Sequence, residues 1–325
     1  MISVHQLTKR FGATLAVDHI SFEIPQGQVV GFLGPNGAGK TTTMRLLAGY
    51  LPPDDGRASL MAMDLTTHSL PIRRRVGYLP ENNPLPDDLE VTDYLHYIGR
   101  LRGLHGSVDR TERLKRVLKL CSLGTVVGKR LSELSKGFRQ RVGLAQAIIH
   151  NPDILILDEP TSGLDPNQVQ EVRGLIHDLK RQKTLLLSTH ILSEVQHTCD
   201  RVLIINKGRI VADGTPTDLA GSLQDSNRLF VALKGPQEEV RDQLSRLSGV
   251  NRVVVHGSAD SGEEGFMVES PASVDLREDV FHMAAKKNWP ILAMHQRRLS
   301  LEEVFRALTH QENGKGKENK NEPLS

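Results

Sequence analysis

Nine residues, from Gly34 to Thr42, combine three glycines with a lysine and two threonines in the order Gly-Pro-Asn-Gly-Ala-Gly-Lys-Thr-Thr. Glycine has no Cβ, so its backbone can take positive φ and approach a ligand closely. Successive backbone N–H groups at the start of a helix form an anion site. A lysine there can reach the β- and γ-phosphates of a nucleotide, and a threonine hydroxyl can ligate Mg²⁺. The spacing predicts a phosphate-binding loop that uses Gly34, Asn36, Gly37, Gly39, Lys40, Thr41 and Thr42, with Lys40 also serving catalysis and Thr41 the metal.

The residues on either side of this loop decide between phosphate binding and a glycine-rich turn that binds nothing. Residues 28–33, which are apolar after Gln28, predict a short buried strand, and residues 43–48 predict a helix. A strand, the loop and a helix in this order favour phosphate binding.

Two adjacent carboxylates, Asp158 and Glu159, follow four apolar residues at 154–157. A continuous apolar run is typical of a central parallel strand that is buried on both faces. The carboxyl end of such a strand lies at the crevice where α/β sheets bind ligands. Asp158 can hold Mg²⁺ there, and Glu159 can orient or deprotonate an attacking water. The alternative is a strand end whose acids only face water.

Three further positions have both a chemical and a structural interpretation. Ser135, followed by Lys136 and Gly137, predicts a helix N-cap that forms a second anion site, or a capped helix with no ligand. His190 ends the buried strand predicted over 184–190 and can contact a γ-phosphate or serve structure alone. Phe11 can stack on an adenine ring or pack on a sheet.

The remaining patterns predict an α/β fold around these residues. We expect strands over 4–7, 20–24, 76–80, 200–205 and 208–212, a turn at 51–56, and helices between 92 and 143. After a change of composition near 219–222, the order strand, helix, strand, strand, helix, strand predicts a ferredoxin-like βαββαβ fold. Ser300 and Glu303 predict a capping box for a last helix, and residues from Gln311 onward have the composition of a disordered tail.

Composition excludes several classes of protein. The 325 residues carry 41 Lys and Arg against 39 Asp and Glu, so a formal charge of +2 gives no reason to expect nucleic acid as a partner. The two cysteines, Cys121 and Cys199, have neither metal-ligand spacing nor a disulfide framework. We expect no signal peptide, and no apolar run approaches the length of a membrane span, so a membrane role requires a separate partner.

The ordered set of motifs resembles the ATP-binding cassette (ABC) family of ATPases over about residues 1–218. Leu134-Ser135-Lys136-Gly137 is similar to the family signature, residues 154–159 to its magnesium strand, and Ser162 to Asp165 to the loop that crosses between subunits. The resemblance implies ATP and Mg²⁺ as ligands, Phe11 under adenine, and His190 as the switch histidine. It also implies a head-to-tail homodimer or heterodimer, in which Ser135, Gly137 and Asp165 complete the ATP site of the partner.

Two positions depart from the family pattern. Glu81 stands where the family usually has a glutamine that contacts Mg²⁺ and relays to the membrane partner. A carboxylate is a harder, charged Mg²⁺ ligand, which puts the energetics of that relay in doubt. The signature has Lys136 and Phe138 where many members have glycine and glutamine, but Ser135 and Gly137 are kept.

The residues from Leu299 to Phe305 resemble the accessory domain of ATPases that serve type-2 exporters, and those from Tyr78 to Leu85 resemble the gliding-motility-associated subgroup. This implies an ATPase subunit, peripheral on the cytoplasmic face of the inner membrane, that powers a separate integral-membrane permease. The expected domains are 1–220 for nucleotide binding (helical part about 84–148), 221–310 as accessory domain and 311–325 as tail. The alternatives are a soluble ABC ATPase with a non-membrane partner and a nucleotide-gated scaffold.

Overall fold

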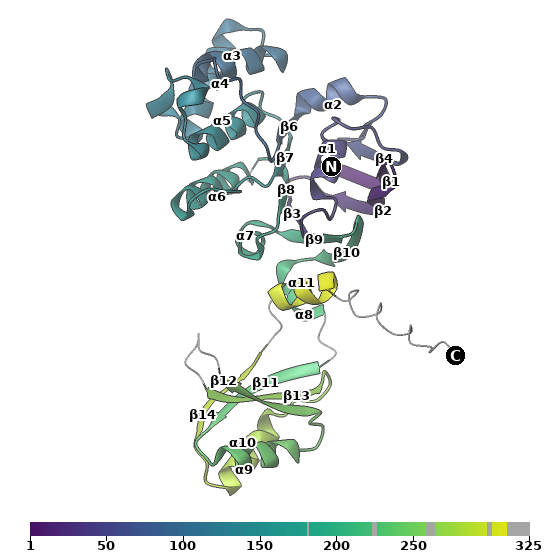
Figure 1. Cartoon of the computed structure of the whole chain (residues 1–325), viewed down its shortest axis with the longest axis vertical. Helices are drawn as coiled ribbons and strands as arrows, with labels where there is room; N and C mark the ends of the chain where they lie inside the picture. Colours follow the sequence, from purple (N-terminus) through teal and green to yellow (C-terminus); the bar gives the residue numbers. More distant parts are fainter. Residues whose placement is uncertain (181, 223–225, 258–263, 298–300, 311–325) are drawn as a thin grey trace, which may run out of the picture. The chain divides into compact units, whose positions relative to one another are not determined.

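The computed structural model describes residues 1–180, 182–222, 226–257, 264–297 and 301–310. The chain forms two compact units, described separately below (Figure 1). The first contains Met1–Pro216 and the end of the last helix from Ala307, and the second contains Thr217–Arg306. Two helices, α8 (Pro216–Ser222) and α11 (Leu301–His310), run across these boundaries.

A six-stranded sheet forms the centre of the first unit, with its strands in the order β10-β9-β3-β8-β7-β6. The strands are β3 (Val29–Leu33), β6 (Val76–Leu79), β7 (Ile154–Asp158), β8 (Thr184–Thr189), β9 (Arg201–Asn206) and β10 (Arg209–Gly214). Neighbouring strands are parallel except β10, which is antiparallel to β9. Every residue of β3, β6, β7 and β8 is buried, which confirms the prediction of a central parallel strand from the apolar run before Asp158.

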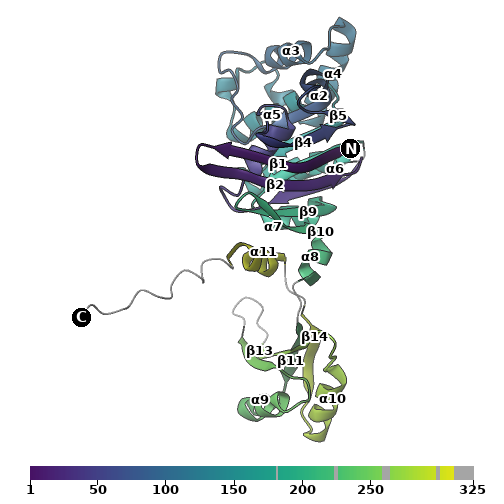
Figure 2. The ribbon, with the colours of Figure 1, turned by 90° about the vertical axis from the view of Figure 1, so that its right-hand side faces the viewer.

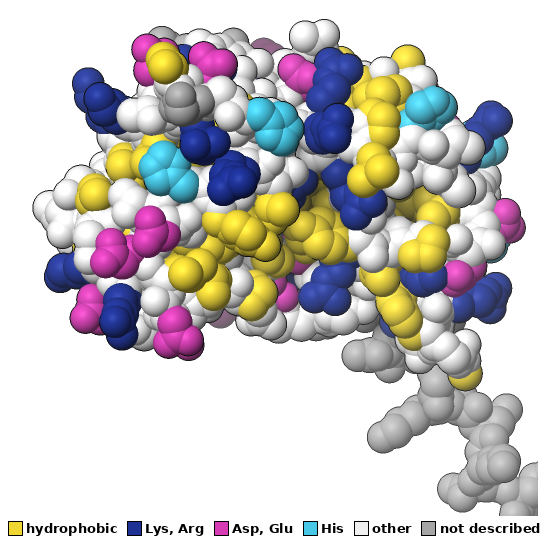
Figure 3. Space-filling view, turned by 90° about the horizontal axis from the view of Figure 1, so that it is seen from above, with side chains coloured by type: hydrophobic (Ala, Val, Ile, Leu, Met, Phe, Trp, Pro, Cys, Tyr) yellow, Lys and Arg dark blue, Asp and Glu magenta, His cyan; other side chains and the backbone are white. Residues whose placement is uncertain are grey.

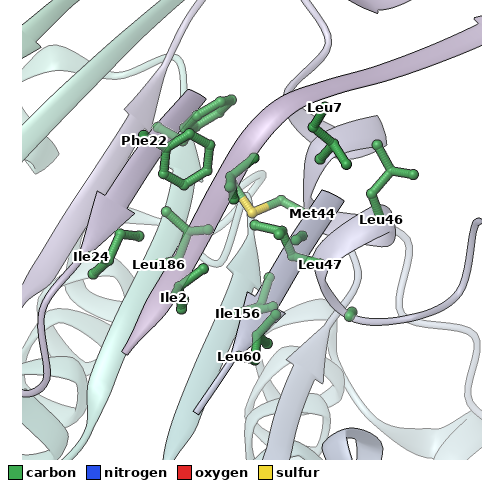
Figure 4. Close-up of a cluster of buried hydrophobic side chains, with 14 of the residues drawn as sticks. Ile2, Leu7, Phe22, Ile24, Met44, Leu46, Leu47, Leu60, Ile156 and Leu186 are labelled. Carbon is green, nitrogen blue, oxygen red and sulfur yellow. The ribbon is translucent and has the colours of Figure 1, made fainter. Parts of the chain in front are cut away.

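A second, antiparallel sheet in the order β2-β1-β4-β5 covers helix α1 (Lys40–Leu47). Its strands are β1 (Ile2–Phe11), β2 (Thr14–Ile24), β4 (Asp55–Leu60) and β5 (Met63–Asp64), and the long strands β1 and β2 lie side by side (Figure 2). One apolar cluster joins this sheet, α1 and the six-stranded sheet (Figure 4). Met44 and Leu47 of α1 belong to this cluster together with Ile2 of β1 and with Ile156 and Leu186 of the six-stranded sheet. The helix that follows the phosphate-binding loop is therefore fixed between two sheets.

Helices account for the rest of the first unit. They are α2 (Ser69–Arg75), α3 (Val91–Leu101), α4 (Ser107–Leu120), α5 (Lys136–Ile148), α6 (Pro166–Lys180) and α7 (Leu192–Thr198). The predicted helical region between residues 92 and 143 is confirmed as α3, α4 and the first part of α5, with short 3₁₀ turns before α5. The predicted N-cap is also confirmed, because the Ser135 hydroxyl accepts a hydrogen bond from the Phe138 N–H at 3.4 Å.

The second unit has the βαββαβ order that the sequence predicts. It contains β11 (Ser226–Leu233), α9 (Gln237–Ser245), β12 (Arg252–Gly257), β13 (Glu264–Pro271), α10 (Arg277–Lys286) and β14 (Ile291–Gln296). The four strands form an antiparallel sheet in the order β12-β13-β11-β14. Val240 of α9 and Val280 of α10 pack with Val231 and Val268 of the sheet in one apolar cluster. Strand β13 lies between β11 and β12 in the sheet, which is the split βαβ arrangement of the ferredoxin-like fold.

Some predicted elements differ from the structure. Helix α1 begins at Lys40 and not at Thr43, because Gly39 takes φ 107° and lets the chain turn directly into the helix. The predicted turn at 51–56 already contains the start of β4, and β5 and α2 were not predicted. The proposed capping residue Ser300 and the tail from residue 311 lie outside the described residues. None of the helices in the described part of the chain combines the length and the apolarity that crossing a bilayer requires.

Candidate nucleotide site

A cavity of about 360 Å³ lies where the phosphate-binding loop faces the carboxyl ends of β7 and β8. Most of the predicted ligands line it: Asn36, Gly37, Gly39, Lys40, Thr41, Thr42, Glu81, Glu159 and His190, together with Ala16 and Ser162. Residues from five separate stretches of the chain therefore meet around one space large enough for part of a nucleotide.

The loop holds Lys40 in a buried position beside the cavity. Its Nζ donates hydrogen bonds to the carbonyl oxygens of Gly34 at 2.7 Å and Pro35 at 3.2 Å. It also lies 3.5 Å from Glu159 Oε1, and the lysine is only 6% exposed. The ammonium group has three donors and these three partners occupy them, so a phosphate bound here would replace at least one of the partners. Gly39 cannot be replaced without strain, because a Cβ there would lie 2.4 Å from the carbonyl oxygen of Ala16.

Asp158, at the end of β7, has the arrangement of a cation ligand. Its Oδ1 accepts hydrogen bonds from Ser188 Oγ at 2.6 Å and from Thr41 Oγ1 at 3.2 Å. Its Oδ2 is buried and has no hydrogen-bond partner. Burial raises the pKa of Asp158, and the nearby carboxylates of Glu81 and Glu159 raise it further. A buried oxygen without a partner is costly, so the site fits a bound cation that would compensate it.

Glu159 turns out of the sheet into the cavity. Its φ is 49°, a left-handed conformation that costs a side-chain-bearing residue about 1–3 kcal/mol. Two hydrogen bonds hold it there, from its N–H to Ser188 Oγ at 3.0 Å and to the Ser188 carbonyl oxygen at 3.2 Å. Its Oε2 lies 2.8 Å from Nδ1 of His190, whose side chain is 47% exposed. The carboxylate thus contacts Lys40 through one oxygen and His190 through the other.

The predicted signature residues lie away from this cavity, beside the predicted crossing loop. Gly137 is buried against Gln168, since a Cβ on it would lie 2.5 Å from Gln168 Cδ. Asp165 accepts a hydrogen bond from the N–H of the same Gln168 at 2.9 Å. Ser135 and Asp165 are both exposed. The start of α5 and the crossing loop therefore form one surface of the chain.

Phe11 also lies outside the residues that line the cavity. It ends β1, is 50% exposed, and has Lys9 Nζ 5.9 Å from the centre of its ring. The structure thus shows neither a stacking partner nor close packing on the sheet at this ring.

Sequence reasoning missed four polar residues that organise the site. Ser188 contacts both Asp158 and the N–H of Glu159, and Glu194 of α7 accepts hydrogen bonds from Thr161 and Thr189. Two of them, Ser188 and Thr189, end strand β8 directly after three leucines, and a polar pair after such an apolar run was the signal that could have identified them.

Comparison with known proteins agrees with this geometry. The family model described as ABC transporter matches residues 17–162. The chain is 34% identical over 317 residues to the Nod factor export ATP-binding protein I of Burkholderia lata, covering 96% of this chain and 97% of that protein. It is 37% identical over 220 residues to the probable multidrug ABC transporter ATP-binding protein YbhF of Escherichia coli, which covers 67% of this chain but only 38% of YbhF.

A solved structure described as the ATP binding subunit of an ABC transporter has 29% identity and a TM-score of 0.62, and covers 67% of this chain and 91% of its own. The alignment with the Burkholderia protein extends over nearly the whole of both sequences, and the solved structure has the same fold. This chain belongs to the family of ATP-binding subunits of ABC transporters.

Proposed function

We propose that the chain is the ATP-hydrolysing subunit of an exporter and powers a separate membrane permease. One observation supports this most directly: a single cavity is lined by a buried lysine and the Glu159–His190 pair, and its lining residue Thr41 donates a hydrogen bond to Asp158, a buried acid whose Oδ2 has no hydrogen-bond partner. This set has the parts that phosphoryl transfer to water requires, namely phosphate binding, charge compensation and orientation of the nucleophile.

Each side chain has a role in this proposal. Lys40 and the backbone N–H groups from Gly34 to Thr42 bind the phosphates. Glu159 orients the attacking water and accepts its proton, while His190 is held by Glu159 close to the γ-phosphate position. Thr41 and Asp158, with Glu81 at the rim, would hold Mg²⁺, which would neutralise charge on the β- and γ-phosphates.

The second surface supports a head-to-tail dimer of cassettes. Ser135, Gly137 and Asp165 do not line the cavity of their own chain, although Ser135 and Asp165 are exposed. We propose that they complete the ATP site of a partner cassette, and that Phe11 stacks on the adenine once the nucleotide is bound.

Apolar surface on the first unit supports a protein partner. Helices α2 and α3 expose Leu70, Tyr97 and Leu101, each by more than half of its surface. Figure 3 shows apolar side chains gathered in a band flanked by Lys and Arg (Figure 3). We propose that the permease binds here and holds the chain at the cytoplasmic face of the inner membrane. The export direction rests on the name of the Burkholderia relative.

The division of the chain follows the same proposal. We propose that residues 1–220 carry the nucleotide chemistry, with the helical part at about 84–148, and that residues 221–310 form an accessory domain; the compact units divide the chain nearby, at Pro216 and at Ala307. Among the residues that the structure describes, no group of three or more His, Cys, Asp or Glu side chains is placed to hold a metal ion.

A pull-down from detergent-solubilised membranes tests the transport role. Full-length Glu159→Gln protein with ATP and Mg²⁺ is the bait, and mass spectrometry identifies what it retains. Recovery of a polytopic membrane protein that is absent without ATP supports the proposal. Recovery of only soluble, ribosomal or DNA-associated proteins would contradict the permease partner and leave the ATPase activity in place.

A further inference from the structure

Glu194 of α7 connects two separate segments of the site through its carboxylate. Its Oε1 accepts a hydrogen bond from Thr161 Oγ1 at 2.5 Å, and its Oε2 accepts one from Thr189 Oγ1 at 2.8 Å. All three side chains are buried, with exposures of 4% for Glu194, 5% for Thr161 and 0% for Thr189. A buried polar group that loses its partner costs about 1–3 kcal/mol, so neither link breaks easily.

Thr189 fixes the turn that carries the switch histidine. Besides donating to Glu194, its hydroxyl accepts a hydrogen bond from the N–H of Ile191 at 3.0 Å. His190 lies between these two residues, so the bonds on either side of it restrict where its ring can point.

Thr161 fixes the other segment, which begins two residues after Glu159. The N–H of Ser162 donates to the carbonyl oxygen of Glu159 at 3.1 Å, and that of Leu164 donates to the carbonyl oxygen of Thr161 at 3.2 Å. The Thr161 hydroxyl therefore ties the first turn of the loop at 162–165 to α7.

We propose that Glu194 is a positioning residue that makes the loop at 162–165 and His190 move as one element, an inference that rests on the function proposed above for this site. A displacement of the loop by a second subunit is then passed through Thr161, Glu194 and Thr189 to the histidine that contacts Glu159. The coupling operates over three side chains and needs no change in the sheet.

Threonine-to-valine variants test the two links, because valine keeps the shape of threonine and lacks the hydroxyl. Thr184→Val is the matched control: Thr184 is at the opposite end of β8, is 1% exposed, and its hydroxyl accepts a hydrogen bond from the Gly27 N–H at 2.9 Å. Thermal unfolding of all variants shows whether each loses a similar amount of stability.

Steady-state ATP hydrolysis separates positioning from stability. We expect Thr161→Val and Thr189→Val to lower kcat by about 10- to 100-fold, as small misplacements of a catalytic group do. We expect KM for ATP to stay within about threefold, and Thr184→Val to keep kcat within about twofold of the wild type. Equal kcat values for the two site variants and the control would overturn the proposal.

Combined variants test whether the links act as one unit. The double variant Thr161→Val/Thr189→Val is expected to match Glu194→Ala, with a loss well below the product of the single losses. Glu194→Gln, which keeps one acceptor oxygen, is expected to restore part of kcat. Single losses that multiply would show independent links and overturn the coupling.

Hydrogen exchange provides a readout that does not require activity. We expect Thr189→Val to speed exchange at the amides of Ser162 and Leu164, on the far side of Glu194, and Thr184→Val to leave them unchanged. Unchanged exchange in Thr189→Val would overturn the proposal even if ATP is hydrolysed. A wild-type protein that hydrolyses no ATP would instead contradict the proposed function, while the exchange result would still decide the coupling.

Discussion

Replacing Glu159 by glutamine removes one negative charge from the cavity and leaves the size of the side chain unchanged. Lys40 loses its charged partner at 3.5 Å, but its Nζ keeps the carbonyl oxygens of Gly34 and Pro35. In the wild-type chain, Nδ1 of His190 lies 2.8 Å from the Glu159 carboxylate, and an amide of the same length can still form a hydrogen bond to this ring. We expect the loop to keep its geometry, and ATP to bind at least as tightly because a negative charge beside the anion site is gone.

The effect on hydrolysis is expected to be large, since an amide cannot accept the proton of the attacking water. Loss of a general base typically slows a reaction by about 10²–10⁴-fold. Each factor of ten corresponds to about 1.4 kcal/mol, so the barrier rises by about 3–5 kcal/mol.

Two assays on full-length protein separate binding from chemistry. Titration with a fluorescent ATP analogue gives the dissociation constant, and phosphate release gives kcat. Glu112→Gln, an exposed residue of α4, makes the same charge change away from the cavity and is expected to match the wild type in both. Full turnover by Glu159→Gln would remove Glu159 from its catalytic role, and loss of ATP binding would show that its charge instead maintains the loop.

Three further changes test other parts of the site and the core. Lys40→Ala removes a hydrogen-bonded cation worth about 2–3 kcal/mol to an anion, so ATP affinity should fall by about 30- to 150-fold, and unchanged affinity would argue against the phosphate-binding loop. Asp158→Asn should raise the unfolding temperature of the nucleotide-free protein, since burial raises the pKa of this acid and disfavours its charge, while Mg²⁺-dependent ATP hydrolysis is lost; a lower unfolding temperature would contradict this. Burial lowers the pKa of His150 from the ordinary histidine value of 6.5 to about 4. Between these two values the unfolded chain binds a proton at this residue that the folded chain does not. The free energy of unfolding should therefore fall by up to about 1.4 kcal/mol for each pH unit as the pH is lowered from 6.5 to 4. Denaturant titrations of wild type and His150→Asn across that range measure the last effect, and parallel pH profiles would refute it.

Local sequence determined the elements in which each motif lies. The phosphate-binding loop was predicted because glycine, lysine and threonine at this spacing have few other uses, and the strand before Asp158 because four apolar residues in a row predict burial on both faces. The cap at Ser135 depends only on residues three positions away, so it too could be read from the sequence. Strand β4 was missed because its first residues, Asp55-Gly56-Arg57, have the composition of a turn, and only pairing with β1 makes them extended.

Tertiary structure decided which side chains meet. The Thr41–Asp158 hydrogen bond joins residues 117 positions apart, and the Glu159–His190 contact joins residues 31 positions apart. These contacts exist because β8 lies between β3 and β7 in the sheet, although β3 is far from both in the chain. Ser188 and Glu194 could not be recognised as parts of the site from their types alone, since a serine in a strand and a glutamate in a helix are ordinary until the fold buries them.

The sequence by itself therefore determined the family, the phosphate-binding loop and the identity of the acids, because those features depend on residues close together in the chain. The free oxygen of Asp158, the left-handed conformation of Glu159 and the buried carboxylate of Glu194 were decided by the packing of the sheet and α7. Hydrogen bonding and burial between distant segments arise only once the strand order is set, and no local pattern of residues carries that order.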